Sequence, residues 1–205
     1  ITVVDLMHEF ELGVWKSLFT HLIRVLYAET PGSTLVNELD SRFRMMPTFG
    51  NDTIQGFATN LSEIKRMGAR DFEDILQCAI PAFESLLPEP HNSAVMLLLF
   101  KAAEWHAFAK LRMHTSATLA HLDSTTKSFC KLMRKFRDET SKSHQTVEIP
   151  REAQAQTRRA ESSAMGIGSK PGSSHRQRRR LNLSTYKFHA LGDYVDVIKS
   201  FGCTD

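Results

Sequence analysis

Apolar residues recur along most of the chain at intervals of three and four positions, which predicts a mainly α-helical protein. The exception is a β-branched run at residues 1–4, which favours a short N-terminal strand. Asp5 follows this run and can cap a first helix that reaches about Ala28 and is ended by Pro31. Further helices are predicted over residues 35–46, 71–87 and 91–114, from a cap at Ser116 to about 136, and over 191–201.

Two of these helices have features that affect the fold. Pro81 lies inside the helix predicted over 71–87 and should kink or split it, because proline lacks the N–H that continues the helical hydrogen bonding. The segment 91–114 is apolar on nearly all sides, so we expect it at the centre of the protein. Residues 51–60 are typical of a loop, and Asn60 or Ser62 is expected to cap a short turn after it.

Composition divides the chain into three parts. Its hydrophobic share, 41%, is sufficient for a packed core. The net charge is only +3, yet the region from Arg151 to Lys187 holds nine Lys or Arg and two Glu, so the remainder is net acidic. Residues 162–174 are rich in Gly and Ser and lack periodicity, which is typical of disorder. We therefore expect a helical region over 1–144, a polar, basic and disordered segment over 145–180, and a return segment over 181–205. Within the second part, residues 148–163 are polar and compatible with a helix.

The cysteines and the hydropathy exclude several classes of protein. Cys78, Cys130 and Cys203 are far apart and form no C-x-x-C pair, which argues against a zinc site and against a secreted disulfide framework. No run of 18 apolar residues is present, so no membrane span is expected. The histidines at 106, 114 and 121 lack ligand spacing, and we interpret them as structural or surface residues. Leu12 stands where the second histidine of an H-E-x-x-H metalloprotease motif is required.

Four groups of residues follow one another along the chain and together carry a resemblance to a known family. The first group opens the first helix: Asp5, His8, Gly13, Val14, Trp15 and Lys16. The second lies at the end of the next helix: Asp40, Arg42, Phe43, Arg44, Met46 and Pro47. The third, made of common residues, and the fourth come later: His114, Thr115, Thr118 and Leu119, then Lys187, His189, Tyr194, Ile198, Gly202 and Asp205. In these elements the chain resembles Plavaka-type DDE transposases of the Kyakuja-Dileera-Zisupton (KDZ) superfamily of fungal transposons.

This resemblance implies a fold and a function. The chain would be the helical insertion region of an RNase H-like transposase, beginning at the strand–helix junction of the core. The complete nuclear enzyme would cleave transposon ends and join them to target DNA, with Mg²⁺ or Mn²⁺ held by carboxylates. Asp5 and His8 would be the remnant of the D-x-x-H junction beside the metals, with Asp5 as one ligand of an incomplete set. The remaining catalytic carboxylates are expected outside residues 1–205, so we expect no activity from this chain alone.

The residues themselves leave alternatives open at this junction. Asp5 is either a metal ligand or simply a helix N-cap, which is a frequent role for Asp. His8 either orients a carboxylate or touches a phosphate, or it bonds the backbone at the helix start. Trp15 and Trp105 either stack on a nucleic-acid base or pack in the core, and their apolar faces favour the core.

Two basic groups are candidates for DNA contact. The first is the run Arg176, Arg178, Arg179 and Arg180, which either binds DNA phosphates, serves as a nuclear localisation signal, or is a solvated flexible tail. The second is a stripe on the helix after Ser116, formed by Lys131, Arg134 and Lys135, which either binds phosphates or is a solvated face. Such contacts would be sequence-independent and salt-sensitive.

Three functional hypotheses follow from the sequence. The first is a fragment of a transposon-encoded DDE transposase. The second is a non-catalytic helical module that binds DNA or protein, and salt-dependent DNA affinity without metal-dependent nicking would favour it. The third is a degenerate relic with no retained function.

Overall fold

The computed structural model describes residues 4–50, 53–164 and 176–202, and these residues are mainly helical, as the sequence predicts. They include no β-strand and two isolated antiparallel bridges, Phe49 with Ile54 and Val147 with Arg178. Most of the strand predicted over 1–4 lies outside the described residues, and Val4 belongs to no regular element. None of the helices in the described part is long and apolar enough to cross a membrane.

The first long helix differs from the prediction in its type. It opens as a π-helix, η1 (Leu6–Trp15), and continues as α1 (Lys16–Glu29). Asp5 caps it as expected, since its carboxylate accepts the N–H of His8 at 2.9 Å. A short 3-10 turn, η2 (Pro31–Ser33), follows.

The middle helices confirm the predicted elements and correct several of their ends. They are α2 (Thr34–Met45), η3 (Leu61–Glu63), α3 (Ala69–Phe83), α4 (His91–Ala109), α5 (Ser116–Phe136) and η4 (Arg137–Ser141). Helix α3 is not split at Pro81, which lies in its last turn, where the missing N–H costs one hydrogen bond only. Helix α4 ends five residues before the predicted position 114. The cap of α5 is Thr115 rather than Ser116, because Thr115 and Thr118 bond each other's backbone N–H groups.

The short turn after the loop is also stabilised differently from the prediction. Asn60 precedes η3 without a side-chain cap bond. The hydroxyl of Ser62 donates instead to the buried carboxylate of Asp40 at 2.6 Å. The turn is therefore attached to α2 rather than capped by its own side chains.

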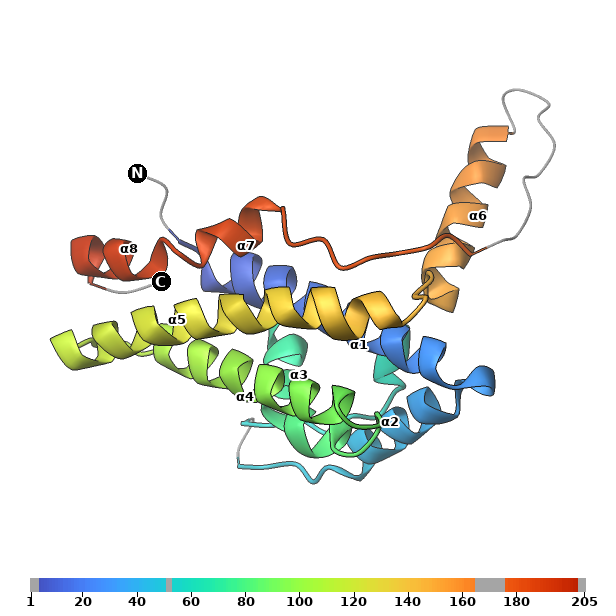
Figure 1. Ribbon diagram of the computed structural model, residues 1–205, viewed down its shortest axis with the longest axis horizontal. Coiled ribbons are helices and arrows are strands. Elements are labelled where there is room, and N and C mark those ends of the chain that lie inside the picture. Colours follow the sequence, from blue (N-terminus) through green and yellow to red (C-terminus); the bar gives the residue numbers. More distant parts are fainter. Residues whose placement is uncertain (1–3, 51–52, 165–175, 203–205) are drawn as a thin grey trace.

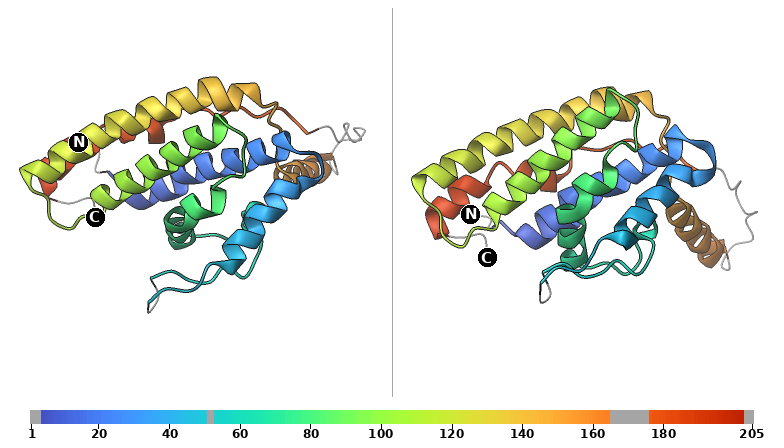
Figure 2. Two further views of the ribbon diagram at one scale, coloured as in Figure 1. Left: turned by 60° about the horizontal axis from the view of Figure 1, so that its bottom comes forward. Right: turned by 90° about the horizontal axis from the view of Figure 1, so that it is seen from below.

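The helices pack around η1, which contacts α3, α4 and α7. Helices α4 and α5 lie side by side as an antiparallel pair, and α2 packs against α1 and α3 (Figures 1 and 2). Phe10 of η1 stacks on Trp105 of α4, with ring centroids 4.6 Å apart. The indole N–H of Trp15 donates to the carbonyl of Phe72 at 2.8 Å. Both tryptophans are buried, which confirms the core-packing interpretation.

The C-terminal third is more ordered than the sequence indicates. It contains α6 (Pro150–Ala164), α7 (Tyr186–Ala190) and α8 (Tyr194–Phe201), so the helix predicted over 191–201 begins three residues later. The helix with which residues 148–163 are compatible is confirmed by α6. The segment 145–180 as a whole was predicted to be disordered, yet Glu148 is buried and residues 162–164 end α6. The rest of the Gly/Ser-rich stretch lies outside the described residues, as do Cys203 and Asp205.

Helix α7 approaches η1 closely at Gly13. A Cβ placed on Gly13 would lie 2.5 Å from Cδ of Lys187 and 2.9 Å from the carbonyl oxygen of His8. Only glycine leaves this space, so the backbone of η1 and the stem of Lys187 can meet. Gly13 and Lys187 belong to the first and the last of the four sequence elements described above.

Candidate nucleic-acid interface

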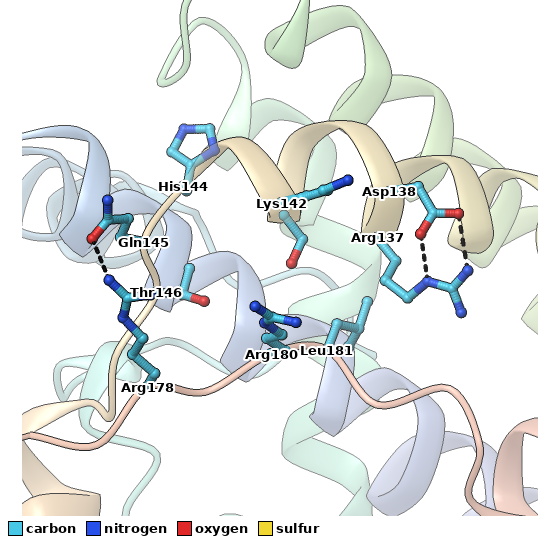
Figure 3. Close-up of a pocket in the computed structure, with 10 residues that line it drawn as sticks. Arg137, Asp138, Lys142, His144, Gln145, Thr146, Arg178, Arg180 and Leu181 are labelled. Carbon is cyan, nitrogen blue, oxygen red and sulfur yellow. Dashed lines mark hydrogen bonds and ion pairs between the residues drawn. The ribbon is translucent and has the colours of Figure 1, made fainter.

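The segment 176–185 leads back along α5 in the opposite direction (Figure 1). Together with α5 and η4 it lines two adjoining cavities, here called the trough. At its η4 end the trough holds a basic cavity of about 270 Å³. The basic side chains that line this cavity are Arg137, Lys142, His144, Arg178 and Arg180 (Figure 3). Among the described residues of its lining, Asp138 is the one acid.

The charges in the basic cavity are only partly compensated. Asp138 pairs with Arg137 through two hydrogen bonds, 2.8 and 2.9 Å long, and these bonds lower the pKa of the Asp138 carboxyl. Arg178 bonds the neutral side-chain amide of Gln145 at 2.9 Å and so keeps its full charge (Figure 3). Arg180 has no salt bridge to an acid of the described chain. The cavity therefore attracts anions, and guanidinium groups match phosphate oxygens well.

Alternation along the extended segment decides which arginines face the cavity. The segment pairs with residues 146–148: Glu148 donates its N–H to the Gln177 carbonyl, and Arg179 donates its N–H to the Thr146 carbonyl, at 2.9 and 3.0 Å. Because successive side chains of an extended chain point to opposite sides, Arg178 and Arg180 line the cavity and Arg179 does not. Arg179 instead donates to the buried carboxylate of Glu148 at 2.6 Å.

The second predicted basic group meets the first only in part. Arg134 of α5 lines a second cavity of about 240 Å³ that adjoins the basic cavity, since Arg137 lines both. Lys131 and Lys135 are exposed and line neither cavity, and Lys135 pairs with Glu139 at 3.8 Å. Arg176 is likewise exposed and lines neither. The structure thus places Arg134 on a cavity that adjoins the one lined by Arg178 and Arg180, which are more than forty positions away in the sequence.

The second cavity, here called the apolar cavity, has a different lining. Its apolar residues are Cys130, Met133, Leu183, Phe188 and Leu191. Arg134, Arg137, Ser184 and His189 supply its polar groups. Burial raises the pKa of the Cys130 thiol, so this cysteine is suited to packing rather than to nucleophilic chemistry.

The Asp5–His8 junction lies on η1 and contributes to neither cavity. One carboxylate oxygen of Asp5 accepts the backbone N–H of His8, and the other lies 2.7 Å from Nδ1 of the same histidine. The backbone bond is the main cause that lowers the pKa of Asp5. Asp5 is thus a helix N-cap by geometry, and His8 orients its carboxylate, with both side chains about half exposed. The described residues contain no group of three His, Cys, Asp or Glu arranged to hold a metal ion, so Asp5 alone does not fit a two-metal site.

The sequence did not indicate the surroundings of several buried polar groups. His106 of α4, interpreted as structural or surface, bonds the buried carboxylate of Glu11 at 3.0 Å. Burial, followed by the charge of Glu9, raises the pKa of Tyr194. His21 is buried in α1 and bonds the hydroxyl of Ser141, a residue that lines the basic cavity, at 2.7 Å. A signal for His21 was present, because it lies one turn after Leu18 on the apolar face of its helix.

Comparison of the chain with protein-family models, with curated proteins and with solved structures gives no match.

Proposed function

We propose that this chain is a DNA-binding helical region of a Plavaka-type DDE transposase and that it acts in the nucleus. Its DNA-binding surface would be the trough between α5, η4 and the segment 176–189. The observation that carries this proposal is that Arg134, from one predicted basic group, and Arg178 and Arg180, from the other, line two adjoining cavities of the trough. The transposase identity is supported by the order of the four sequence elements.

The trough suits the DNA backbone for electrostatic reasons. Arg134, Lys142, Arg178 and Arg180 have no salt bridge to an acid among the described residues, so their charges are available to phosphates. Each phosphate neutralised releases counterions, and the affinity then falls with salt by a slope of about −0.9 per contact in B-DNA. Four contacts would give a slope of about −4 and no reading of base sequence.

Strand cleavage would need partners that the described residues do not supply. In the complete transposase Mg²⁺ or Mn²⁺ would be held by several carboxylates, and Asp5, oriented by His8, is the candidate from this chain. No cleavage step is derived from the described residues alone. The second hypothesis, a non-catalytic helical module that binds DNA, would use the same trough and differ only in lacking nuclease chemistry.

Binding of a fluorescent DNA duplex, followed by anisotropy at increasing salt, tests the proposal. We expect the double variant Arg178→Ala/Arg180→Ala to weaken binding and to make the salt slope shallower by about 2, or about 1 for each phosphate contact removed. The matched control is Arg158→Ala/Arg159→Ala, which removes the same charge from the exposed surface of α6 and should change the affinity little. Equal losses in the two double variants would contradict a defined trough. Absence of DNA binding would refute the proposal and leave a protein-binding module or a relic.

Nicking of supercoiled DNA in Mg²⁺ or Mn²⁺ separates the two remaining hypotheses when it is measured with the complete transposase proposed here, because residues 1–205 alone are expected to be inactive. Asp5→Asn keeps an oxygen that caps the helix but removes the carboxylate charge. Metal-dependent nicking by the complete protein that is lost in Asp5→Asn would support the transposase chemistry. DNA binding without nicking by the complete protein would favour the non-catalytic module.

A further inference from the structure

The apolar cavity has a lining suited to a flat ring. Phe188, partly buried, offers an aromatic surface beside the aliphatic side chains of Met133, Leu183 and Leu191. None of the described residues that line it is acidic. Its volume of about 240 Å³ exceeds what a single water needs and is too small for a folded segment.

The apolar cavity adjoins the basic cavity. Arg137 lines both, and the segment between them is short, since Leu181 lines the basic cavity and Leu183 the apolar one. Cationic groups therefore lie next to an aromatic and aliphatic surface. A ligand that occupied both cavities would need an anionic group attached to a flat, hydrogen-bonding ring.

We propose that the trough binds an unpaired nucleotide, with its phosphate in the basic cavity and its base in the apolar cavity against Phe188. This inference rests on the proposed function, since it assigns the phosphate to the same arginines. Every base has a π-face that stacks on an aromatic side chain, so the site accepts bases without sequence preference. The guanidinium groups of Arg134 and Arg137 at the cavity supply donors for acceptor atoms on the base edge.

Only an unpaired base can enter such a site. In a duplex the base is stacked on both faces, and its extraction costs unstacking and unpairing energy. The two cavities together therefore favour single-stranded DNA, or a base extruded from a distorted duplex, over regular duplex. Duplex would still use the basic cavity through its backbone.

The test compares a fluorescent single strand, a strand of the same length that is abasic at every position, and a duplex of equal length, all at one salt concentration. We expect the intact single strand to bind tighter than the duplex, and the fully abasic strand to bind roughly 5- to 150-fold more weakly than the intact strand, the range of stacking of one base on an aromatic side chain. Because abasic DNA leaves the protein unaltered, this result does not depend on how any variant folds.

Variants then locate the base. Phe188→Leu keeps an apolar side chain but removes the ring, so it should lower the affinity for the intact strand and leave that for the abasic strand unchanged. Phe201→Ala removes an exposed aromatic ring outside both cavities and should affect neither. Arg178→Ala/Arg180→Ala should weaken the single strand and the duplex alike.

The outcomes distinguish an error in the base site from an error in the DNA-binding function of the trough. If intact and abasic strands bind equally well to the unaltered protein, the base site is wrong while the phosphate-binding trough stands. If abasic DNA binds weakly but Phe188→Leu makes no difference to either strand, the base lies elsewhere and the assignment to the apolar cavity is wrong. If neither strand nor duplex binds, the proposed function itself fails.

Discussion

The buried histidine of α1 gives a prediction about acid stability next to the basic cavity. His21 is fully buried, and its Nε2 bonds the Ser141 hydroxyl at 2.7 Å. Its Nδ1 has no hydrogen-bond partner in the described structure. Burial lowers the pKa of His21 to about 4 from 6.5, and the positive charges of Arg24 and His144 act in the same direction.

The sign and size of the effect follow from this pKa. A histidine with a lowered folded-state pKa takes up its proton first in the unfolded chain, so falling pH favours unfolding. The loss of folding stability begins as the pH falls below 6.5 and is complete near pH 4. At about 1.36 kcal/mol for each pKa unit, the total is about 3 kcal/mol, of which about 2 kcal/mol is lost between pH 7.5 and pH 5.

Urea unfolding followed by circular dichroism at these two pH values measures the effect. His21→Gln removes the titrating group, so its free energy of unfolding should fall by about 2 kcal/mol less than that of the unaltered protein over this pH interval. The comparison concerns the pH dependence, because the substitution also changes packing at all pH values. His189→Gln, at an exposed histidine of α7 that forms no ion pair with an acid among the described residues, should retain the pH dependence of the unaltered protein. The same pH dependence in His21→Gln and the unaltered protein would refute the reasoning.

Three further predictions concern stability and are measured by the same urea unfolding. Gly13→Ala should destabilise by about 1–3 kcal/mol because its Cβ overlaps neighbouring atoms, whereas Gly56→Ala, whose Cβ would have its nearest neighbour at 3.4 Å, should change little. Arg179→Ala should cost about 2 kcal/mol, because the buried Glu148 carboxylate loses its charged partner but keeps hydrogen bonds from Gln156 and from the Gln177 N–H, and a change within about 0.5 kcal/mol would contradict this. Asp5→Ala should cost about 1 kcal/mol through loss of the helix cap, and Asp5→Asn should cost clearly less.

The spacing of apolar residues predicted where the helices lie, but it did not predict the backbone hydrogen bonds of η1 or the capping residue of α5. The apolar spacing located α2, α4 and α5, since burial of one face requires that spacing. The same spacing does not distinguish η1 from an α-helix, because it reports which side chains face the core and not which carbonyl each N–H meets. The cap of α5 is a similar case, as Thr115 and Ser116 both have suitable hydroxyls and only the backbone conformation selects Thr115.

The sequence predicted which basic residues belong to the candidate site but not how they are arranged, because that arrangement depends on contacts between residues far apart in the sequence. The sequence identified a basic run, but it gave no sign that Glu148 would hold Arg179 from 31 positions away. Nor did it indicate that Arg134 would lie near the same run. These pairings depend on how the segment 176–185 folds back along α5, which no local pattern specifies.

Because successive arginines of the basic run point to opposite sides, fewer of them can contact phosphates than the number of basic residues suggests. If all seven basic residues chosen from the sequence contacted phosphates, the salt slope for duplex DNA would be about −6 at −0.9 for each contact. The structure uses Arg179 to hold the segment against Glu148 and directs Arg178 and Arg180 into the cavity. The middle arginine then fixes the two that flank it, so Arg179→Ala should weaken DNA binding indirectly, by releasing the segment. A slope near −4 that persists in Arg179→Ala with lower affinity would fit this division of roles. A slope that falls by about 1 would instead place Arg179 on a phosphate.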